Sequence, residues 1–181
     1  MAVFISAGHN TKGQRDPGAV KGPLIEAVLT EDFKKLVVPI CVGLGLKVIT
    51  DRDDERLSDY LKRIKTGAGS VVLEFHFDAG PETATGTTVI VGDDADRLDK
   101  AFAKELAEVT SATLGIKNRG VISEAQSRRG RLGLMREQGT VALLEVCFIT
   151  NKDDMAKFNA NKVELATKIA KIVKKYEDLI P

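Results

Sequence analysis

The stretch that decides the fold is Val141-Ala142-Leu143-Leu144-Glu145-Val146-Cys147-Phe148-Ile149, an apolar run interrupted by a single carboxylate. A run of this length and composition predicts a strand that is buried on both faces of a sheet. Residues 71–77 follow the same pattern and contain His76, and residues 3–5 form a shorter run that leads into a turn before His9. Strands of this kind favour a largely parallel sheet that helices cover on both faces.

Segments with helical periodicity alternate with these strands. Apolar residues of 25–44 recur at intervals of three and four, which predicts a helix with one buried stripe. We expect it to begin at Gly22-Pro23, because proline is favoured at the first helical position, and to bend at Pro39. The pattern predicts further helices at 57–64 behind a Ser58 cap, at 98–109 with Gly115 as its end, and at 163–176, and further strands at 47–50 and 86–91. Residues 117–138 show no clear period and predict a loop with a short helix near Leu132 to Met135.

The composition is that of a soluble globular protein. The 181 residues include 43% hydrophobic side chains and carry a net charge of +1, so we expect a single domain over residues 1–181. The small net charge and the lack of tryptophan argue against nucleic acid as a partner. Cys41 and Cys147 lie in apolar runs, which predicts buried free thiols.

The sequence shows no pattern typical of export or of membrane anchoring. The first apolar run has neither a basic segment before it nor a cleavage site after it, so we expect no signal peptide. The longest apolar stretch, around residues 36–46, is shorter than the ~20 residues that a membrane span requires. We therefore expect no membrane span.

The only two histidines, His9 and His76, both fall at the ends of predicted strands. In sheets of this type, ligands bind at the edge formed by the carboxyl ends of the strands. Imidazole is the commonest zinc ligand in proteins, and a catalytic zinc site uses three protein ligands. Glu26, in the first turn of the following helix, is a natural third ligand, so these three residues predict a zinc site.

Glu145 lies within the buried run, where a carboxylate is costly unless it binds metal, forms an ion pair or acts as an acid or base. Beside a zinc site it is suited to take a proton from water and to deliver it to a leaving amine, which is the chemistry of amide hydrolysis. Cys147 is expected on the same strand face, but its apolar surroundings disfavour a nucleophilic thiol.

Structural roles for the same residues stay open at this point. The two histidines can be satisfied core residues, Glu26 can complement the helix dipole, and Glu145 can pair with an arginine. Glu74 and Asp78, which flank His76, are rival ligands or bases.

Sequence motifs occur in order along nearly the whole chain. They are Ala7-Gly8-His9, Asp16-Pro17-Gly18-Ala19, Gly22, Glu26, Thr50-Asp51-Arg52-Asp53, Arg63, His76, Gly86, Asn118-Arg119-Gly120-Val121 and Leu144-Glu145-Val146-Cys147-Phe148-Ile149-Thr150-Asn151. This series resembles the zinc-dependent N-acetylmuramoyl-L-alanine amidases, which cleave bacterial peptidoglycan.

The resemblance implies a three-layer α/β sandwich with a mixed, mostly parallel six-stranded sheet. It implies one zinc ion held by His9, Glu26 and His76, with Glu145 as the catalytic residue. The implied reaction is hydrolysis of the amide that joins the lactyl group of N-acetylmuramic acid to the L-alanine of the stem peptide. Asn118 and Arg119, which belong to the motif series, are candidates for contact with this substrate, and Arg131 of the basic segment is a third candidate.

The sequence departs from the family pattern around the two histidines. Glu74 and Asp78 stand where the family commonly has serine and asparagine, and Asn10 follows His9 where the family usually has a small residue. None of these differences removes an expected ligand or the expected base.

The expected biological role is that of a phage or prophage endolysin, made in the cytoplasm and released to the cell wall, or of a wall-remodelling enzyme. The alternatives are a zinc peptidase that cuts within the stem peptide and a catalytically silent wall-binding domain. Arg128 and Arg129, with Arg131, are interpreted as a solvated loop in preference to a grip on substrate carboxylates.

Overall fold

The computed structural model describes residues 2–10 and 16–179. Within these residues, six strands form one sheet in the order β4-β1-β5-β8-β6-β7. Their bounds are β1 (Val3–Ala7), β4 (Val48–Thr50), β5 (Val71–Asp78), β6 (Thr87–Val91), β7 (Asn118–Ser123) and β8 (Thr140–Phe148). Strands β4, β1, β5 and β8 are parallel, whereas β6 is antiparallel to β8 and parallel to β7. The predicted mixed, mostly parallel sheet is confirmed.

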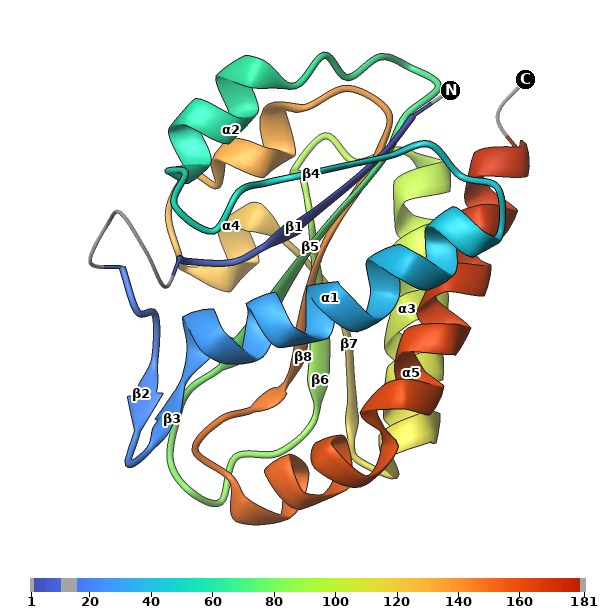
Figure 1. Ribbon diagram of the computed structural model, residues 1–181. Helices are drawn as coiled ribbons and strands as arrows, with labels where there is room; N and C mark the ends of the chain where they lie inside the picture. Colours follow the sequence, from blue (N-terminus) through green and yellow to red (C-terminus); the bar gives the residue numbers. More distant parts are fainter. Residues whose placement is uncertain (1, 11–15, 180–181) are drawn as a thin grey trace.

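Helices lie on both sides of this sheet (Figure 1). Helices α1 (Glu26–Gly43), α3 (Arg97–Leu114) and α5 (Lys152–Leu179) pack on one side, which we call the closed face. Helix α2 (Leu57–Arg63), the short α4 (Glu124–Ser127) and the 3-10 helix η1 (Gly133–Arg136) lie on the other side, the open face. The expected three layers are therefore present.

Alternation along β5 separates the two faces. Leu73, Phe75 and Phe77 join the closed-face core, where Phe75 and Phe77 meet aromatic rings of α1 and α5 edge to face. Glu74 and His76 point to the open face, where only part of the sheet is covered by an apolar cluster around Phe4, Tyr60, Val72, Ile90 and Leu134. The remaining part of the open face carries polar side chains.

The start of α1 differs from the prediction. The helix begins at Glu26, and the residues before it form a two-stranded hairpin of β2 (Val20–Lys21) and β3 (Leu24–Ile25). Gly22, with φ of 57°, occupies the turn of this hairpin, so Gly22-Pro23 connects two strands and does not open a helix. The backbone N–H of Glu26 donates to the carbonyl of Ala19, which brings the hairpin close to the helix start.

Two other helix ends test the predicted caps. Helix α3 begins with a capping box between Asp96 and Asp99 and ends at Gly115, whose φ of 63° is the left-handed conformation expected there. The Ser58 cap is wrong: α2 starts after Arg56, no side chain caps it, and Ser58 lies inside the helix.

The prediction of a loop over residues 117–138 is wrong for its first half. Residues 118–123 form β7 at the edge of the sheet, and α4 follows directly. An edge strand pairs on one side only and remains half exposed, so its sequence lacks the apolar alternation that would have revealed it. The short helix predicted near Leu132 to Met135 is present as η1.

The strand β8 contains an irregularity that changes the predicted face of Cys147. Its register with β5 pairs His76 with Glu145 but Asp78 with Phe148, so one extra residue is inserted between them. Cys147 therefore joins the closed-face core, with its sulfur 3.9 Å from that of Met155 on α5. The expectation that it shares a face with Glu145 is wrong.

Among the described residues, no helix is both long enough and apolar enough to cross a membrane.

Candidate metal centre and active site

Three side chains from three different elements meet at the carboxyl ends of β1 and β5. His9 follows β1, Glu26 is the first residue of α1, and His76 lies near the end of β5. One nitrogen of each imidazole and a carboxylate oxygen of Glu26 all lie within 4.8 Å of one another. His9 Nε2 is 3.2 Å from Glu26 Oε2, and His76 Nδ1 is 3.0 Å from Glu26 Oε1. The structure thus brings together the three residues that the sequence suggested as ligands.

Each of these three groups also has a partner outside the cluster. His9 Nδ1 lies 2.8 Å from Asp16 Oδ1, and His76 Nε2 lies 3.0 Å from Glu74 Oε1. The carboxylate of Glu26 accepts hydrogen bonds from the backbone N–H groups of Ala19 and Phe77. These contacts fix the orientation of all three side chains.

Two glycines allow the rings to approach the backbone this closely. A Cβ atom on Gly8 would lie 2.3 Å from the His76 ring, and one on Gly18 would lie 2.4 Å from the His9 ring. His9 itself has a φ of 66°, which is uncommon for a residue with a side chain. Such conformations occur at functional sites, where the surrounding structure stabilises them.

The charges of the cluster are strongly coupled. Burial alone would lower the pKa of His76, but its hydrogen bonds with Glu26 and Glu74 outweigh this effect and raise the pKa to about 10. Burial would raise the pKa of Glu26, but hydrogen bonds from both histidines hold it far below its usual range. Glu26 is therefore an anion at neutral pH, as a metal ligand must be.

Glu145 lies beside this cluster on β8, where it is the register partner of His76. Its side chain is 1% exposed, and neither carboxylate oxygen makes a hydrogen bond with a described residue. Burial raises the pKa of Glu145 to about 7, although the positive charges of His76 and Arg129 oppose this shift. A buried carboxylate without hydrogen bonds is costly, and a pKa close to neutrality is the property of a general base.

The interpretation of Arg129 as part of a solvated loop is wrong. One guanidinium nitrogen lies 2.9 Å from Glu145 Oε1 and 3.0 Å from Asp78 Oδ1. The contact with Glu145 is an ion pair without hydrogen-bond geometry, whereas the contact with Asp78 is a hydrogen bond. The sequence left open whether Glu145 pairs with an arginine, and the structure shows that it does. The same arginine contacts Asp78. No periodicity marked Arg129, because it lies in a turn after α4.

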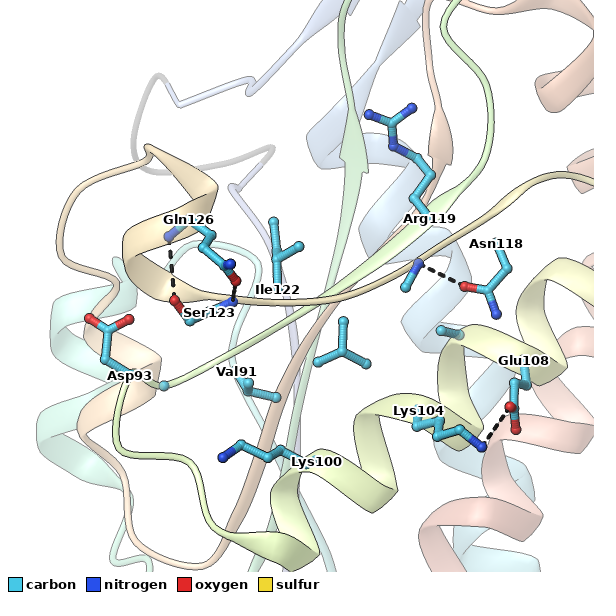
Figure 2. Close-up of a pocket in the computed structure, with 14 residues that line it drawn as sticks. Val91, Asp93, Lys100, Lys104, Glu108, Asn118, Arg119, Ile122, Ser123 and Gln126 are labelled. Atoms are coloured by element: carbon cyan, nitrogen blue, oxygen red, sulfur yellow. Dashed lines mark hydrogen bonds and ion pairs between the residues drawn. The ribbon is translucent and has the colours of Figure 1, made fainter.

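Two of the three expected substrate residues, Asn118 and Arg119, line two cavities that meet at the start of β7. One cavity, of about 460 Å³, is lined by Asn118 and Arg119 together with Glu145 and Arg129. The other, of about 720 Å³, lies between β7 and α3 and shares Asn118 and Arg119 with the first (Figure 2). Arg131 is exposed and is not among the described residues that line either cavity.

The types of metal-ligand atom in the cluster determine which chemistry it can support. Two imidazole nitrogens and one carboxylate oxygen form the three-residue set of many catalytic zinc sites. Glu74 lies on the side of the His76 ring that faces away from Glu26, and Asp78 contacts Arg129, so neither joins the three converging groups. Cys147 is buried on the other face, and burial raises the pKa of its thiol well above its usual range. The arrangement fits a metal ion beside a general base.

Comparison with known proteins places these observations in a family. The sequence profile of the N-acetylmuramoyl-L-alanine amidase family matches residues 3–175. No match was found among curated protein sequences.

Solved structures of similar fold include proteins designated as amidases and the catalytic domain of an endolysin. A protein from Neisseria meningitidis assigned as an N-acetylmuramoyl-L-alanine amidase is 29% identical, with a TM-score of 0.77 over 96% of this chain and 94% of the other. The catalytic domain of CwlV, an N-acetylmuramoyl-L-alanine amidase from Bacillus (Paenibacillus) polymyxa, is 22% identical, with a TM-score of 0.78 over the full length of both chains. The catalytic domain of the CD27L endolysin, which targets Clostridia difficile, is 19% identical, with a TM-score of 0.74 over 97% of each chain.

The family profile extends over nearly the entire chain and includes all four residues of the cluster and its neighbouring base. The chain therefore belongs to the N-acetylmuramoyl-L-alanine amidase family, hydrolases that act on peptidoglycan.

Proposed function

We propose that this protein is a zinc-dependent amidase, with one catalytic domain over residues 1–181, that separates the stem peptide of peptidoglycan from its sugar. The bond cleaved is the amide between the lactyl group of N-acetylmuramic acid and L-alanine. The observation that carries this proposal is the convergence of His9, Glu26 and His76 beside the buried carboxylate of Glu145.

The three converging residues would hold a single zinc ion through His9 Nε2, His76 Nδ1 and an oxygen of Glu26. Zinc bound there would polarise the amide carbonyl and acidify the attacking water. The anionic state of Glu26 and the fixed orientation of both rings support this assignment, because a preorganised set of ligands loses little freedom when it binds metal.

Glu145 acts as the general base. Its carboxylate oxygens, which make no hydrogen bond with a described residue, can accept a proton from water as the water oxygen bonds to the carbonyl carbon. The carbon–nitrogen bond then breaks, and the same proton passes from Glu145 to the departing amine of L-alanine. The products are a lactyl carboxylate and a free amino terminus, and the carboxylate of Glu145 is restored.

The substrate would approach along the cavity that contains Glu145. Asn118 and Arg119 line this cavity and are assigned to substrate contact. Arg119 lies over the ring of Phe148 at 5.1 Å, which limits where its guanidinium can point. Arg131 is exposed outside the cavity and would contact only a part of the substrate that extends beyond it.

We further propose that the enzyme degrades or remodels the cell wall, as a phage or prophage endolysin that reaches the wall from the cytoplasm or as a bacterial wall amidase. Similarity to the CD27L endolysin domain and to CwlV supports a role of this kind. If the enzyme is lytic, its addition to suspended bacteria with permeabilised outer layers should lower their turbidity.

Mass spectrometry of the soluble products from purified peptidoglycan tests the reaction. We expect free stem peptides that begin with L-alanine, no such products after chelation, and their return when zinc is added back. Shortened peptides still attached to sugar would instead establish a peptidase. Zinc binding without any product, on walls of several chemotypes, would indicate a silent wall-binding domain.

A further inference from the structure

Glu74 is a buried carboxylate that the proposed reaction does not use. It lies on β5 two residues before His76, on the same face, and its side chain is 3% exposed. One oxygen accepts a hydrogen bond from the hydroxyl of Ser6 on β1 at 3.0 Å, and the other lies 3.0 Å from His76 Nε2. A carboxylate at this depth needs partners for both oxygens, and Ser6 and His76 provide them.

The ring of His76 lies between two carboxylates. Its Nδ1 faces Glu26, and its Nε2 faces Glu74. An imidazole that binds metal through one nitrogen carries its proton on the other, so only one of the two carboxylates can share a metal ion with it. His9 Nε2 also faces Glu26, which places the shared metal position on the Nδ1 side.

We propose that Glu74 is a positioning residue for the metal, which accepts the Nε2–H of His76 and so holds Nδ1 toward the ligand cluster. This inference rests on the proposed zinc-dependent function. The negative charge of Glu74 also makes the imidazole a stronger electron donor, because hydrogen bonding to a carboxylate raises the basicity of a ligating histidine. Glu74 and His76 lie on the same strand, β5, so the strand that carries the ligand also carries the residue that orients it.

His9 also contacts a carboxylate outside the cluster, that of Asp16, but this carboxylate is exposed. Asp16 lies 2.8 Å from His9 Nδ1, but its side chain is 60% exposed, against 3% for Glu74. Solvent and salt screen the exposed pair, so Asp16 contributes less to metal binding than Glu74 does. The two contacts provide an internal comparison within one site.

The test measures the zinc affinity of the full chain by competition with a chromophoric chelator. Removal of an outer carboxylate typically weakens metal binding 10–100-fold, so we expect a loss of about this size for Glu74→Ala. Glu74→Gln keeps an oxygen that can accept the Nε2–H but lacks the charge, and its affinity should fall between those of Glu74→Ala and the unmodified protein. Asp16→Asn should lose less affinity than Glu74→Ala.

A matched control separates positioning from general stability. Glu124 is also a buried carboxylate, paired with Arg136 and away from the cluster. Glu124→Gln should leave zinc affinity unchanged even if it lowers the melting temperature. Circular dichroism establishes that each variant is folded, and Glu74→Gln decides the matter if Glu74→Ala does not fold.

The outcomes distinguish this inference from the proposed function. Weaker zinc binding by the Glu74 variants, with Glu124→Gln unchanged, supports the positioning role. Affinities of folded Glu74 variants within twofold of the unmodified protein overturn it and leave the zinc-dependent function intact. Failure of the unmodified protein to bind zinc overturns both.

Discussion

The closed and open faces of the sheet are built from alternate residues of the same strands, yet they differ in what they bury. On β8, Leu144 is 0% exposed in the closed-face core, and the next residue, Glu145, is 1% exposed on the open face. Burial alone therefore does not distinguish a core residue from a catalytic candidate. What distinguishes them is how the buried group is satisfied: Leu144 packs among apolar side chains, whereas the carboxylate of Glu145 makes no hydrogen bond with a described residue and contacts Arg129 only as an ion pair.

The difference shows how one strand can serve both stability and chemistry. Successive side chains of a strand point to opposite faces, so an apolar core on one face does not constrain the residue types on the other. Helices α1, α3 and α5 cover the closed face, whereas α2, α4 and η1 lie on the open face (Figure 1), to which Glu74 and His76 also point. The closed face supplies a rigid support for the cluster around His76.

The largest expected effect is the loss of activity when Glu145 on the open face is replaced. Glu145→Gln preserves the shape of the side chain but removes the proton acceptor, so we expect kcat for amide cleavage to fall by a factor of about 10²–10⁴. Zinc content should be unchanged, because Glu145 is not among the three converging ligands. A rate within tenfold of the unmodified enzyme would show that another residue is the base.

Replacement of Leu144, the neighbour of Glu145 on the closed face, should lower stability and leave activity nearly unchanged. Leu144→Ala creates a cavity in the closed-face core and should lower the free energy of unfolding by about 2–5 kcal/mol, as measured by denaturant titration. The folded enzyme should retain kcat within a few-fold. A hundredfold loss of kcat in folded protein would contradict the separation of the two faces.

The same Glu145→Gln change should stabilise the fold in a pH-dependent way. Burial raises the pKa of Glu145 from 4.5 to about 7, so the folded state of the unmodified protein loses stability as pH rises from 4.5 through 7. The variant lacks this loss and should be more stable by roughly 3 kcal/mol above pH 7, with little difference near pH 4. Denaturant titrations at both pH values, with chelator present, measure the two differences. Equal stabilities at pH 8 would be inconsistent with a raised pKa for the buried carboxylate of Glu145.

The smallest expected effect concerns the arginine next to Glu145. The positive charge of Arg129 opposes the rise in the pKa of Glu145, so Arg129→Ala should move the acid limb of the kcat/KM profile to higher pH. Because Arg129 is about one-third exposed, the free energy of unfolding should change by less than about 1 kcal/mol. Movement of the limb to lower pH would contradict the ion pair.

Much of the closed face was predictable from sequence, because its residues follow simple periodicities. The runs at residues 71–77 and 141–149 predicted β5 and β8, and the stripe of residues 25–44 predicted α1. The edge strand β7 and the hairpin of β2 and β3 were missed, since a half-exposed or two-residue strand leaves no periodic signal. The inserted residue in β8, which turns Cys147 to the closed face, depends on strand pairing and is invisible along one chain.

The sequence predicted the part of the site that contains histidine, because histidine is rare in this chain. Two histidines in 181 residues, both near strand ends, drew attention to the correct edge of the sheet. The place of Glu26 in the first helix and of Glu145 inside an apolar run indicated the third ligand and the base, and the resemblance to known amidases implied the same two residues. The outer contacts were not predictable in the same way. Asp16, Glu74 and Arg129 are common residue types whose roles depend on distances of about 3 Å across the fold.

The central claim is that the open face holds one zinc ion between His9, Glu26 and His76, next to Glu145. An anomalous difference map at the zinc absorption edge, from crystals grown with zinc, tests it most directly. The account predicts one dominant peak at about 2.0–2.2 Å from His9 Nε2, His76 Nδ1 and an oxygen of Glu26. A dominant peak on the Nε2 side of His76 with Glu74, or the absence of a peak at this cluster, would contradict it.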